Sequence, residues 1–578
     1  MLAPERSPDE LRTARTRLPG ALLWLVLCST ASAQYAITDY PGATTPFRIV
    51  AGPDGNMWFT DYPSSIGCIT PASLVVEYPA SVAAASHPFG IAAGPDGNLW
   101  FTEMAGNQIG SITTAGAVTE YSSGLSPASS PYEITAGPDG NLWFTEYAGN
   151  RIGSISTAGV IAEYAIPTPK SSPSGIAAGP DGNLWFTELT GNKIGSISVT
   201  GVITEYSAGL TAGSSPSGIA AGSDGALWFI EGFTQSGHSR IGRISTDGLV
   251  TEYSKGLTAG SSPNGIAAGP DGALWFTEGI GARIGRITTE GVITEYSGGI
   301  TPASHPNGVA AGPDGTVWFT EVTSGRIGRL AIPVPSIAAG GVLSAASYLP
   351  GPLSPGDLVS IFGAALGPST PILLTLNLSG LVATSLEGVS VSFNGYPAPL
   401  TYVGPTQINA IVPYEVAGNS SATVQVTYGT MGSNQATVQL AATAPAIFTL
   451  NSSGSGPGAI LNQDFSLNTQ KNPAATGTAI QVFLTGEGLT APAQATGQVT
   501  MVNASGSGPL TPVPQLAVSV LIGGQPAHLD FAGEAPDVVA GVLQVNATIP
   551  ATAVSGANAI AVQVGDNSSQ SGVTVWVR

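Results

Sequence analysis

The sequence predicts an all-β protein: a seven-bladed β-propeller followed by two β-sandwich domains of the immunoglobulin-like kind. The first observation is a ten-residue phrase, GPDGNLWFTE, which occurs unchanged at residues 94–103, 137–146 and 179–188. Looser copies complete a set of seven Trp-Phe pairs that recur every 42 to 47 residues, a period typical of a four-stranded propeller blade. The second observation is the abundance of glycine (77) and proline (45), which fits short strands joined by tight turns. The pairs begin at Trp58, Trp100, Trp143, Trp185, Trp228, Trp275 and Trp318.

A single repeat, residues 173–206, shows how four strands are predicted in each blade. Its apolar or alternating runs cover residues 174–180, 183–188, 193–198 and 202–206. The turn PDG separates the first two runs, because proline presets its φ angle and glycine accepts a positive φ. One such sheet cannot bury both of its faces alone, whereas seven sheets packed around an axis can.

The two ends of the repeat array predict how the ring closes. Residues 35–40 (YAITDY) match the fourth-strand pattern VITEY, while the last repeat stops after residues 326–332 without a fourth strand of its own. We therefore expect residues 35–40 to supply the outer strand of the last blade, so that the propeller spans residues 34–332. An unpaired edge strand would otherwise invite aggregation.

The first 33 residues have the features of a secretory signal peptide. Arg12, Arg15 and Arg17 form a positive region before the apolar run ALLWLVL, and the small-residue site ASA ends at residue 33. The apolar run is too short to span a bilayer, which needs ~20 residues, so no transmembrane anchor is expected after cleavage. The segment predicts a secreted, periplasmic or cell-surface protein.

The composition changes after a proline-rich linker at residues 333–336. Two longer internal repeats follow, since residues 390–416 resemble residues 519–554. Alternating strands and turn signals predict one β-sandwich over residues 337–450 and a second over residues 451–578.

The overall charge limits the class of partner. The formal net charge is −19 and the isoelectric point is near 4.4. Nucleic-acid binding needs a basic surface that neutralises phosphates, so this class of partner is excluded. We expect a monomer that binds an extracellular small molecule, peptide or glycan.

The loop that precedes the first strand of each blade, here called the mouth loop, is the place where the repeats differ. Each mouth loop carries a proline, and the residue after it varies around the ring. We predict that these variable residues, together with His87, bind a ligand; the alternative is that they are tolerant loop positions. The predicted set is Phe47, Phe89, Tyr132, Ser174, Ser217, Asn264 and Asn307.

A carboxylate ends the second predicted strand of every blade. Converging acids could hold a cation, which makes Glu278 and Glu321 candidate metal ligands. Alternatively, an acid repeated in every blade accepts backbone N–H groups or pairs with the basic residue that begins strand three. The seven acids are Asp61, Glu103, Glu146, Glu188, Glu231, Glu278 and Glu321.

The pattern GPDGNLWFTE … GN[RK]IGxI … GVITEY resembles the virginiamycin B lyase family, also called streptogramin lyases, over residues 35–332. The resemblance implies a seven-bladed propeller in which Mg²⁺ and histidine linearise a cyclic depsipeptide by elimination across its ester bond. The C-terminal half resembles, less specifically, immunoglobulin-like modules of secreted bacterial proteins.

The family's active-site residues do not recur at the matching positions of this chain. The histidine of the sixth mouth loop falls on Asn264, and the family motif Glu-Pro-His-Gly falls on residues 305–308 (HPNG), which places Asn307 at the second histidine. The late metal-binding glutamate falls on Val322. The sequence therefore predicts a binding protein. The alternative is a Mg²⁺-dependent carbon–oxygen lyase in which His305 is the catalytic base, with Glu321 or Glu278 near the metal.

Overall fold

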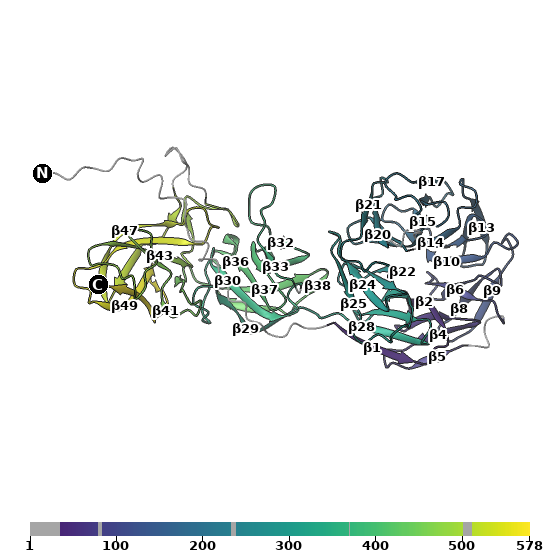
Figure 1. Ribbon diagram of the computed structural model, residues 1–578, viewed down its shortest axis with the longest axis horizontal. Coiled ribbons are helices and arrows are strands. Elements are labelled where there is room, and N and C mark those ends of the chain that lie inside the picture. Colours follow the sequence, from purple (N-terminus) through teal and green to yellow (C-terminus); the bar gives the residue numbers. More distant parts are fainter. Residues whose placement is uncertain (1–34, 79–83, 233–238, 369, 501–510) are drawn as a thin grey trace. The chain divides into compact units, whose positions relative to one another are not determined.

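The computed structural model describes residues 35–78, 84–232, 239–368, 370–500 and 511–578, in two compact units, Gln34–Pro333 and Val334–Arg578 (Figure 1). The predicted all-β class is confirmed: within these described ranges the only helix is the 3₁₀ turn η1 (Tyr414–Val416). No described helix is long and apolar enough to cross a membrane. The predicted signal segment, residues 1–33, lies outside the described residues.

The first unit is a ring of seven four-stranded antiparallel sheets, the blades, numbered here in chain order. Blades 1 to 6 each use four consecutive strands, whereas blade 7 has the order β1-β28-β27-β26. The strands of blades 1 to 3 are β2 (Pro46–Ala51), β3 (Met57–Asp61), β4 (Ser65–Ile69), β5 (Val75–Glu77), β6 (Pro88–Ala93), β7 (Leu99–Glu103), β8 (Gln108–Ile112), β9 (Val118–Tyr121), β10 (Pro131–Ala136), β11 (Leu142–Glu146), β12 (Arg151–Ile155) and β13 (Ile161–Ala165).

Blades 4 to 7 repeat the same plan. Their strands are β14 (Pro173–Ala178), β15 (Leu184–Glu188), β16 (Lys193–Ile197), β17 (Ile203–Tyr206), β18 (Pro216–Ala221), β19 (Leu227–Glu231), β20 (Arg240–Ile244), β21 (Val250–Tyr253), β22 (Pro263–Ala268), β23 (Leu274–Glu278), β24 (Arg283–Ile287), β25 (Ile293–Tyr296), β26 (Pro306–Ala311), β27 (Val317–Glu321), β28 (Arg326–Ala331) and β1 (Ala36–Pro41).

The repeated phrase forms the interior of a blade. In blade 2, the indole nitrogen Nε1 of Trp100 donates to Asp96 Oδ1 at 3.1 Å, so the polar edge of the buried ring is satisfied. The same indole stacks on Tyr121 with ring centroids 5.3 Å apart. The ring of Phe101 covers Gly110, where a Cβ would lie 2.2 Å from Phe101 Cζ. The glycine in strand three is therefore required by the phenylalanine in strand two.

Neighbouring blades share their hydrophobic cores. Trp58 and Ile66 of blade 1 pack in one cluster with Leu99, Phe101 and Ile112 of blade 2. All five of these residues are fully buried. Each blade thus buries the apolar face that it could not bury alone, which is the reason for radial stacking.

Blade 7 takes its outer strand from the start of the described chain. Strand β1 pairs antiparallel with β28, with Ala36 opposite Ala331 and Tyr40 opposite Ile327. Tyr40 stacks on Trp318 at a centroid distance of 5.8 Å, the place that a strand-four tyrosine occupies in the other blades. Strand β1 therefore supplies both the edge pairing and the stacking partner of the last tryptophan.

The second unit contains two β-sandwich domains. The first packs a five-stranded sheet against a six-stranded sheet around a core that includes Val359, Phe393 and Val424. Its strands are β29 (Ser336–Ser344), β30 (Leu358–Ala364), β31 (Ile372–Leu373), β32 (Ser385–Leu386), β33 (Val389–Phe393), β34 (Tyr396–Pro397), β35 (Leu400–Val403), β36 (Gln407–Ile411), β37 (Ser421–Tyr428), β38 (Met431–Gly432) and β39 (Ala436–Gln439).

The second sandwich consists mainly of one continuous ten-stranded sheet. Its separate hydrophobic core includes Val482, Val545 and Val562. Its strands are β40 (Ala446–Ile447), β41 (Gly456–Pro457), β42 (Ile460–Asn462), β43 (Ala479–Thr485), β44 (Thr490–Ala491), β45 (Val513–Pro514), β46 (Val518–Ile522), β47 (Gln525–Glu534), β48 (Leu543–Thr548), β49 (Gly556–Val564), β50 (Asn567–Ser568) and β51 (Val573–Val577).

Removal of β1 is expected to destabilise the whole ring. A chain that lacks residues 35–40 leaves β28 with an unpaired edge and Trp318 without its stacked tyrosine, so its melting temperature should fall by about 5 °C or more. Thermal unfolding followed by circular dichroism measures the change. A shortened chain that melts at the same temperature as one beginning at Gln34 would show that β1 does not close the ring.

Candidate functional site

Each mouth loop leads into a β-bulge, in which two residues of the first strand face one residue of the second. In blade 2, Pro88 lies opposite Glu103, but the next paired residue, Ile91, lies opposite Phe101. Two residues, Phe89 and Gly90, therefore face one residue on the neighbouring strand. A bulge of this kind redirects side chains at the rim of a sheet. The same register shift follows the mouth-loop proline in all seven blades.

The threonine of strand two holds the bulge in place and joins it to the next blade. Thr102 Oγ1 accepts a hydrogen bond from Gly90 N at 2.9 Å and donates to the carbonyl oxygen of Tyr132 in blade 3 at 2.6 Å. In blade 5, Ile230 takes the place of this threonine. We call the set the threonine relay. Its members are Thr60, Thr102, Thr145, Thr187, Thr277 and Thr320.

Aromatic side chains of blades 1 to 3 form a continuous row at this end of the propeller. Phe47 lies 5.6 Å from Phe89, and Phe89 stacks on Tyr132 at 4.0 Å, measured between ring centroids. Tyr62 extends the row from Phe47 at 6.1 Å, and Tyr147 extends it from Tyr132 at 5.4 Å. All five rings are at least partly exposed. Three predicted ligand-binding residues therefore come together.

His87 joins the same row, because its ring lies 4.4 Å from that of Tyr62. Tyr62 and Tyr147 were missed by the sequence reasoning. A signal for them exists: the residue after the acid of strand two is aromatic only in blades 1 and 3. Burial raises the pKa of Tyr132 to about 12, so its hydroxyl remains a neutral phenol near pH 7.

An ion pair beside the aromatic row connects three blades. Arg48 Nε lies 2.5 Å from Glu133 Oε1, and Arg48 Nη1 donates to Asn307 Oδ1. The guanidinium carbon of Arg48 lies 4.9 Å from the centroid of Phe89. Arg48 and Glu133 occupy the second bulge position, where the other five blades have glycine. The sequence reasoning missed this pair, which makes the site nearly neutral in charge.

The polar residues predicted to bind a ligand differ in how deeply they are buried. Ser174 is only 6% exposed, and its carbonyl oxygen accepts the hydrogen bond of Thr145. Ser217, Asn264 and Asn307 are half-buried. The hydroxyl of Ser217 has no hydrogen-bond partner. The site is thus aromatic over blades 1 to 3 and carries amide and hydroxyl groups over blades 5 to 7.

The histidine and the two acids of the lyase alternative differ in exposure, although the backbone of His305 lies beside the end of β27, which carries Glu321. His305 is exposed, whereas the carboxyl groups of Glu278 and Glu321 are fully buried in separate blades. Within the described part of the chain, no group of three histidine, cysteine, aspartate or glutamate side chains could hold a metal ion. The residues that the family resemblance implies therefore do not fit a Mg²⁺ ion.

The buried acid of strand two faces a second acid on strand four of the same blade. Burial, with the strand-four glutamate adding to it, raises the pKa of Glu103, Glu188 and Glu231 to about 7. The same causes raise the pKa of Glu146 and Glu278 to about 8. In these blades one acid of each pair therefore keeps its proton to a higher pH than an ordinary glutamate does.

The expected pairing of the ring acids with the basic residue of strand three is mostly wrong. Lys193 Nζ lies 2.8 Å from Glu205 on strand four, and Arg151 and Arg240 likewise pair with strand-four glutamates. Among the ion pairs of the described residues, Arg283 alone also reaches a ring acid, at 3.6 Å from Glu278. The other strand-three bases act on the ring acid of their blade through charge, since Arg151, Lys193 and Arg240 partly offset the rise that burial causes in the pKa of Glu146, Glu188 and Glu231. In blade 1, Asp61 instead accepts backbone N–H groups, from Thr44 at 2.7 Å and Thr45 at 2.5 Å.

The acid pairs predict that the protein becomes more stable as the pH falls from 8 to 5. A carboxyl group whose pKa is raised by folding keeps its proton in the native state while the unfolded chain has lost it. As the pH rises from the unfolded to the folded pKa of such a group, the free energy of unfolding therefore decreases by about 1.4 kcal/mol per pH unit for each group. Urea unfolding at pH 5, 6, 7 and 8 measures this slope.

The variant Glu146→Gln should show a smaller slope, by one proton, because the amide does not titrate. Replacing the exposed Asp566 by Asn is the matched control and should leave the slope unchanged. Equal slopes in the native chain and Glu146→Gln would contradict the assignment.

Comparison with known proteins supports the propeller and one sandwich. The model of the virginiamycin B lyase family matches residues 27–210 and 208–334, and that of the IPT/TIG domain, an immunoglobulin-like fold, matches residues 343–440. No curated protein sequence matched the chain.

Three solved structures illustrate the similarity. A selenomethionine-substituted virginiamycin B lyase from Staphylococcus aureus is 40% identical over 52% of this chain and 100% of its own, with a TM-score of 0.48. A streptogramin B lyase is 35% identical over 53% of this chain and 100% of its own, with a TM-score of 0.49. A catalytically inactive histidine-to-alanine variant of the S. aureus enzyme with quinupristin is 38% identical over 52% of this chain and 100% of its own, with a TM-score of 0.48.

The matches to the family model together span residues 27–334, more than half of the 578 residues. The chain therefore belongs to the virginiamycin B lyase family.

Proposed function

We propose that the propeller is the ligand-binding domain of an exported protein, and that it binds its ligand without cleaving it. The observation that carries the proposal is the row of partly exposed aromatic rings from Tyr62 to Tyr147. Aromatic rings of this size bury much apolar area when they are covered, so a row that stays exposed favours a binding surface. Export is proposed from the signal-like residues 1–33.

The chemistry of the site favours a compact ligand with two different sides. An apolar or ring-bearing side would pack on Phe47, Phe89 and Tyr132. Amide or hydroxyl groups on the other side would form hydrogen bonds with Asn264 and Ser217. Ligand sites are commonly built in this way, with mainly apolar walls and a few polar groups that fix orientation. A small molecule, peptide or glycan of this kind is the proposed ligand class.

Binding without catalysis is proposed from Asn264 and Asn307. Elimination requires a group that removes a proton, and a carboxamide does not accept one near neutral pH. His305 is exposed, whereas Glu278 and Glu321 are buried within separate blades and face other acids. The absence of a proton-accepting side chain at Asn264 and Asn307 therefore counts against the lyase alternative.

Quinupristin is a suitable probe, since a family member has been solved with it. We expect the antibiotic to bind the mature chain, measured by calorimetry, and to remain cyclic in the presence of Mg²⁺, measured by chromatography and fragmentation spectra. The double variant Phe89→Ala/Tyr132→Ala should bind about tenfold more weakly, because stacked aromatic contacts of this size contribute about 1 kcal/mol or more.

The exposed Tyr396 of the first sandwich provides the control variant, Tyr396→Ala, which should bind as the native chain does. A linear product that disappears with a chelator would establish the lyase alternative. Binding that is unaffected by the Phe89→Ala/Tyr132→Ala change would place the ligand elsewhere.

A further inference from the structure

Three carboxyl groups are buried where the two sandwiches of the second unit meet. Asp357 lies in the turn before β30 of the first sandwich. Glu487 follows β43, and Glu534 ends β47, both in the second sandwich. Their exposed fractions are 0%, 1% and 1%. The other acids of residues 337–578 are Glu387, Glu415, Asp464, Asp530, Asp537 and Asp566, so a third of the acids in this half are hidden at one junction.

These carboxyl groups lack the partners that a buried charge needs. Neither oxygen of Asp357 or of Glu487 accepts a hydrogen bond. Glu534 accepts the backbone N–H of Gly541, at 3.1 and 3.2 Å, and its other close polar neighbour is the carboxyl group of Glu487. The hydroxyl of Tyr414, which faces the two glutamates, is also without a partner. No lysine, arginine or histidine in the described ranges forms an ion pair with the three acids.

The junction itself is tightly packed. A Cβ at Gly541 of the second sandwich would lie 2.0 Å from the carbonyl oxygen of Gly356 of the first. Leu358 N donates to Thr485 Oγ1 at 2.9 Å across the junction. Because the backbones are this close, separation of the two sandwiches would be needed to expose all three carboxyl groups fully to water.

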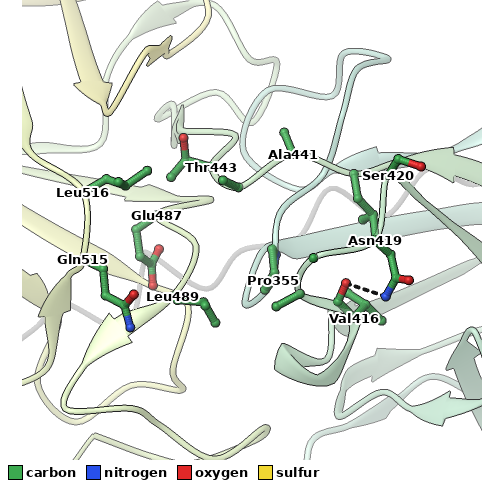
Figure 2. Close-up of a pocket in the computed structure, with 14 residues that line it drawn as sticks. Pro355, Val416, Asn419, Ser420, Ala441, Thr443, Glu487, Leu489, Gln515 and Leu516 are labelled. Carbon is green, nitrogen blue, oxygen red and sulfur yellow. Dashed lines mark hydrogen bonds between the residues drawn. The ribbon is translucent and has the colours of Figure 1, made fainter.

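A crevice of about 470 Å³ runs along the same junction (Figure 2). Glu487, Leu489, Gln515 and Leu516 of the second sandwich line one side. Pro355, Val416 and Asn419 of the first sandwich line the other. The crevice marks the line along which the two sandwiches would part.

Protonation decides whether the closed junction is favourable. Burial raises the pKa of Asp357, with Glu487 adding to the rise. Burial likewise raises the pKa of Glu487 to about 7, and burial together with the charge of Glu487 raises that of Glu534. An ionised carboxylate without a partner is costly to bury, so the closed junction retains protons that separated sandwiches would release.

We propose that the junction is a proton-controlled hinge, closed while Asp357, Glu487 and Glu534 carry protons and opened when they ionise. The closed state holds up to three more protons than the open state between about pH 4.5 and neutrality. Opening therefore becomes more favourable as the pH rises, with an equilibrium constant that increases by up to about 1000-fold per pH unit. The hinge is independent of any ligand at the propeller.

Fluorescence quenching across the crevice tests the hinge in the full mature chain. Bimane is attached at Asn419→Cys, an exposed position, and Leu516→Trp supplies the quencher on the opposite side. Cys68 is only 3% exposed and should remain unlabelled. We expect strong quenching at pH 5 that is lost by pH 8, in a transition that involves between one and three protons. A labelled chain without the new tryptophan corrects for the dye's own pH response.

Unchanged quenching from pH 5 to pH 9 would overturn the proposal, and so would a loss of quenching that coincides with unfolding of the sandwiches in circular dichroism. The variant Glu487→Gln should lose about one proton from the transition, and Asp357→Asn/Glu487→Gln/Glu534→Gln should stay closed at every pH. If the triple variant does not fold, the single variant alone decides. The exposed Asp566→Asn change serves as the control and should keep the full response.

Discussion

The threonine relay is the interaction on which the propeller's functional end depends. One hydroxyl in strand two accepts the N–H of its own blade's bulge and donates to the carbonyl of the next, as Thr102 does between Gly90 and Tyr132. Both groups would otherwise be buried without partners at the place where the ladder is interrupted. Thr320 continues the pattern to Phe47, so the last blade is joined to the first. The relay fixes the backbone and leaves the side chain at the first bulge position free to vary.

This arrangement separates stability from recognition. The tryptophan, its aspartate and its stacked tyrosine recur in every blade, because each blade buries an indole ring whose N–H group needs a hydrogen-bond acceptor. At the first bulge position the side chain differs from blade to blade, and there the chain places Phe47, Phe89 and Tyr132 on one side and amides on the other. The ion pair of Arg48 and Glu133 then ties blades 1, 3 and 7 together beside the aromatic row.

Much of this architecture was predictable from the sequence, and the exceptions have physical causes. The period and the turn residues predict strands such as 183–188, which the structure has as β15, Leu184–Glu188. The bulges were not predictable, since an apolar pattern does not state a register shift. Arg48 and Glu133 are 85 residues apart, so no local pattern joins them. Asp357, Glu487 and Glu534 were missed because charged side chains are almost always exposed.

The most direct test of this account is the free energy of unfolding of Thr102→Val, measured beside Thr119→Val. Valine keeps the shape of the side chain but can neither accept from Gly90 nor donate to Tyr132, and Thr119 is an exposed residue of β9. We expect a loss of about 1–3 kcal/mol for Thr102→Val, in a single transition of the ring, and little change for Thr119→Val. Equal and small losses for both variants would contradict the claim that the relay holds the blades together.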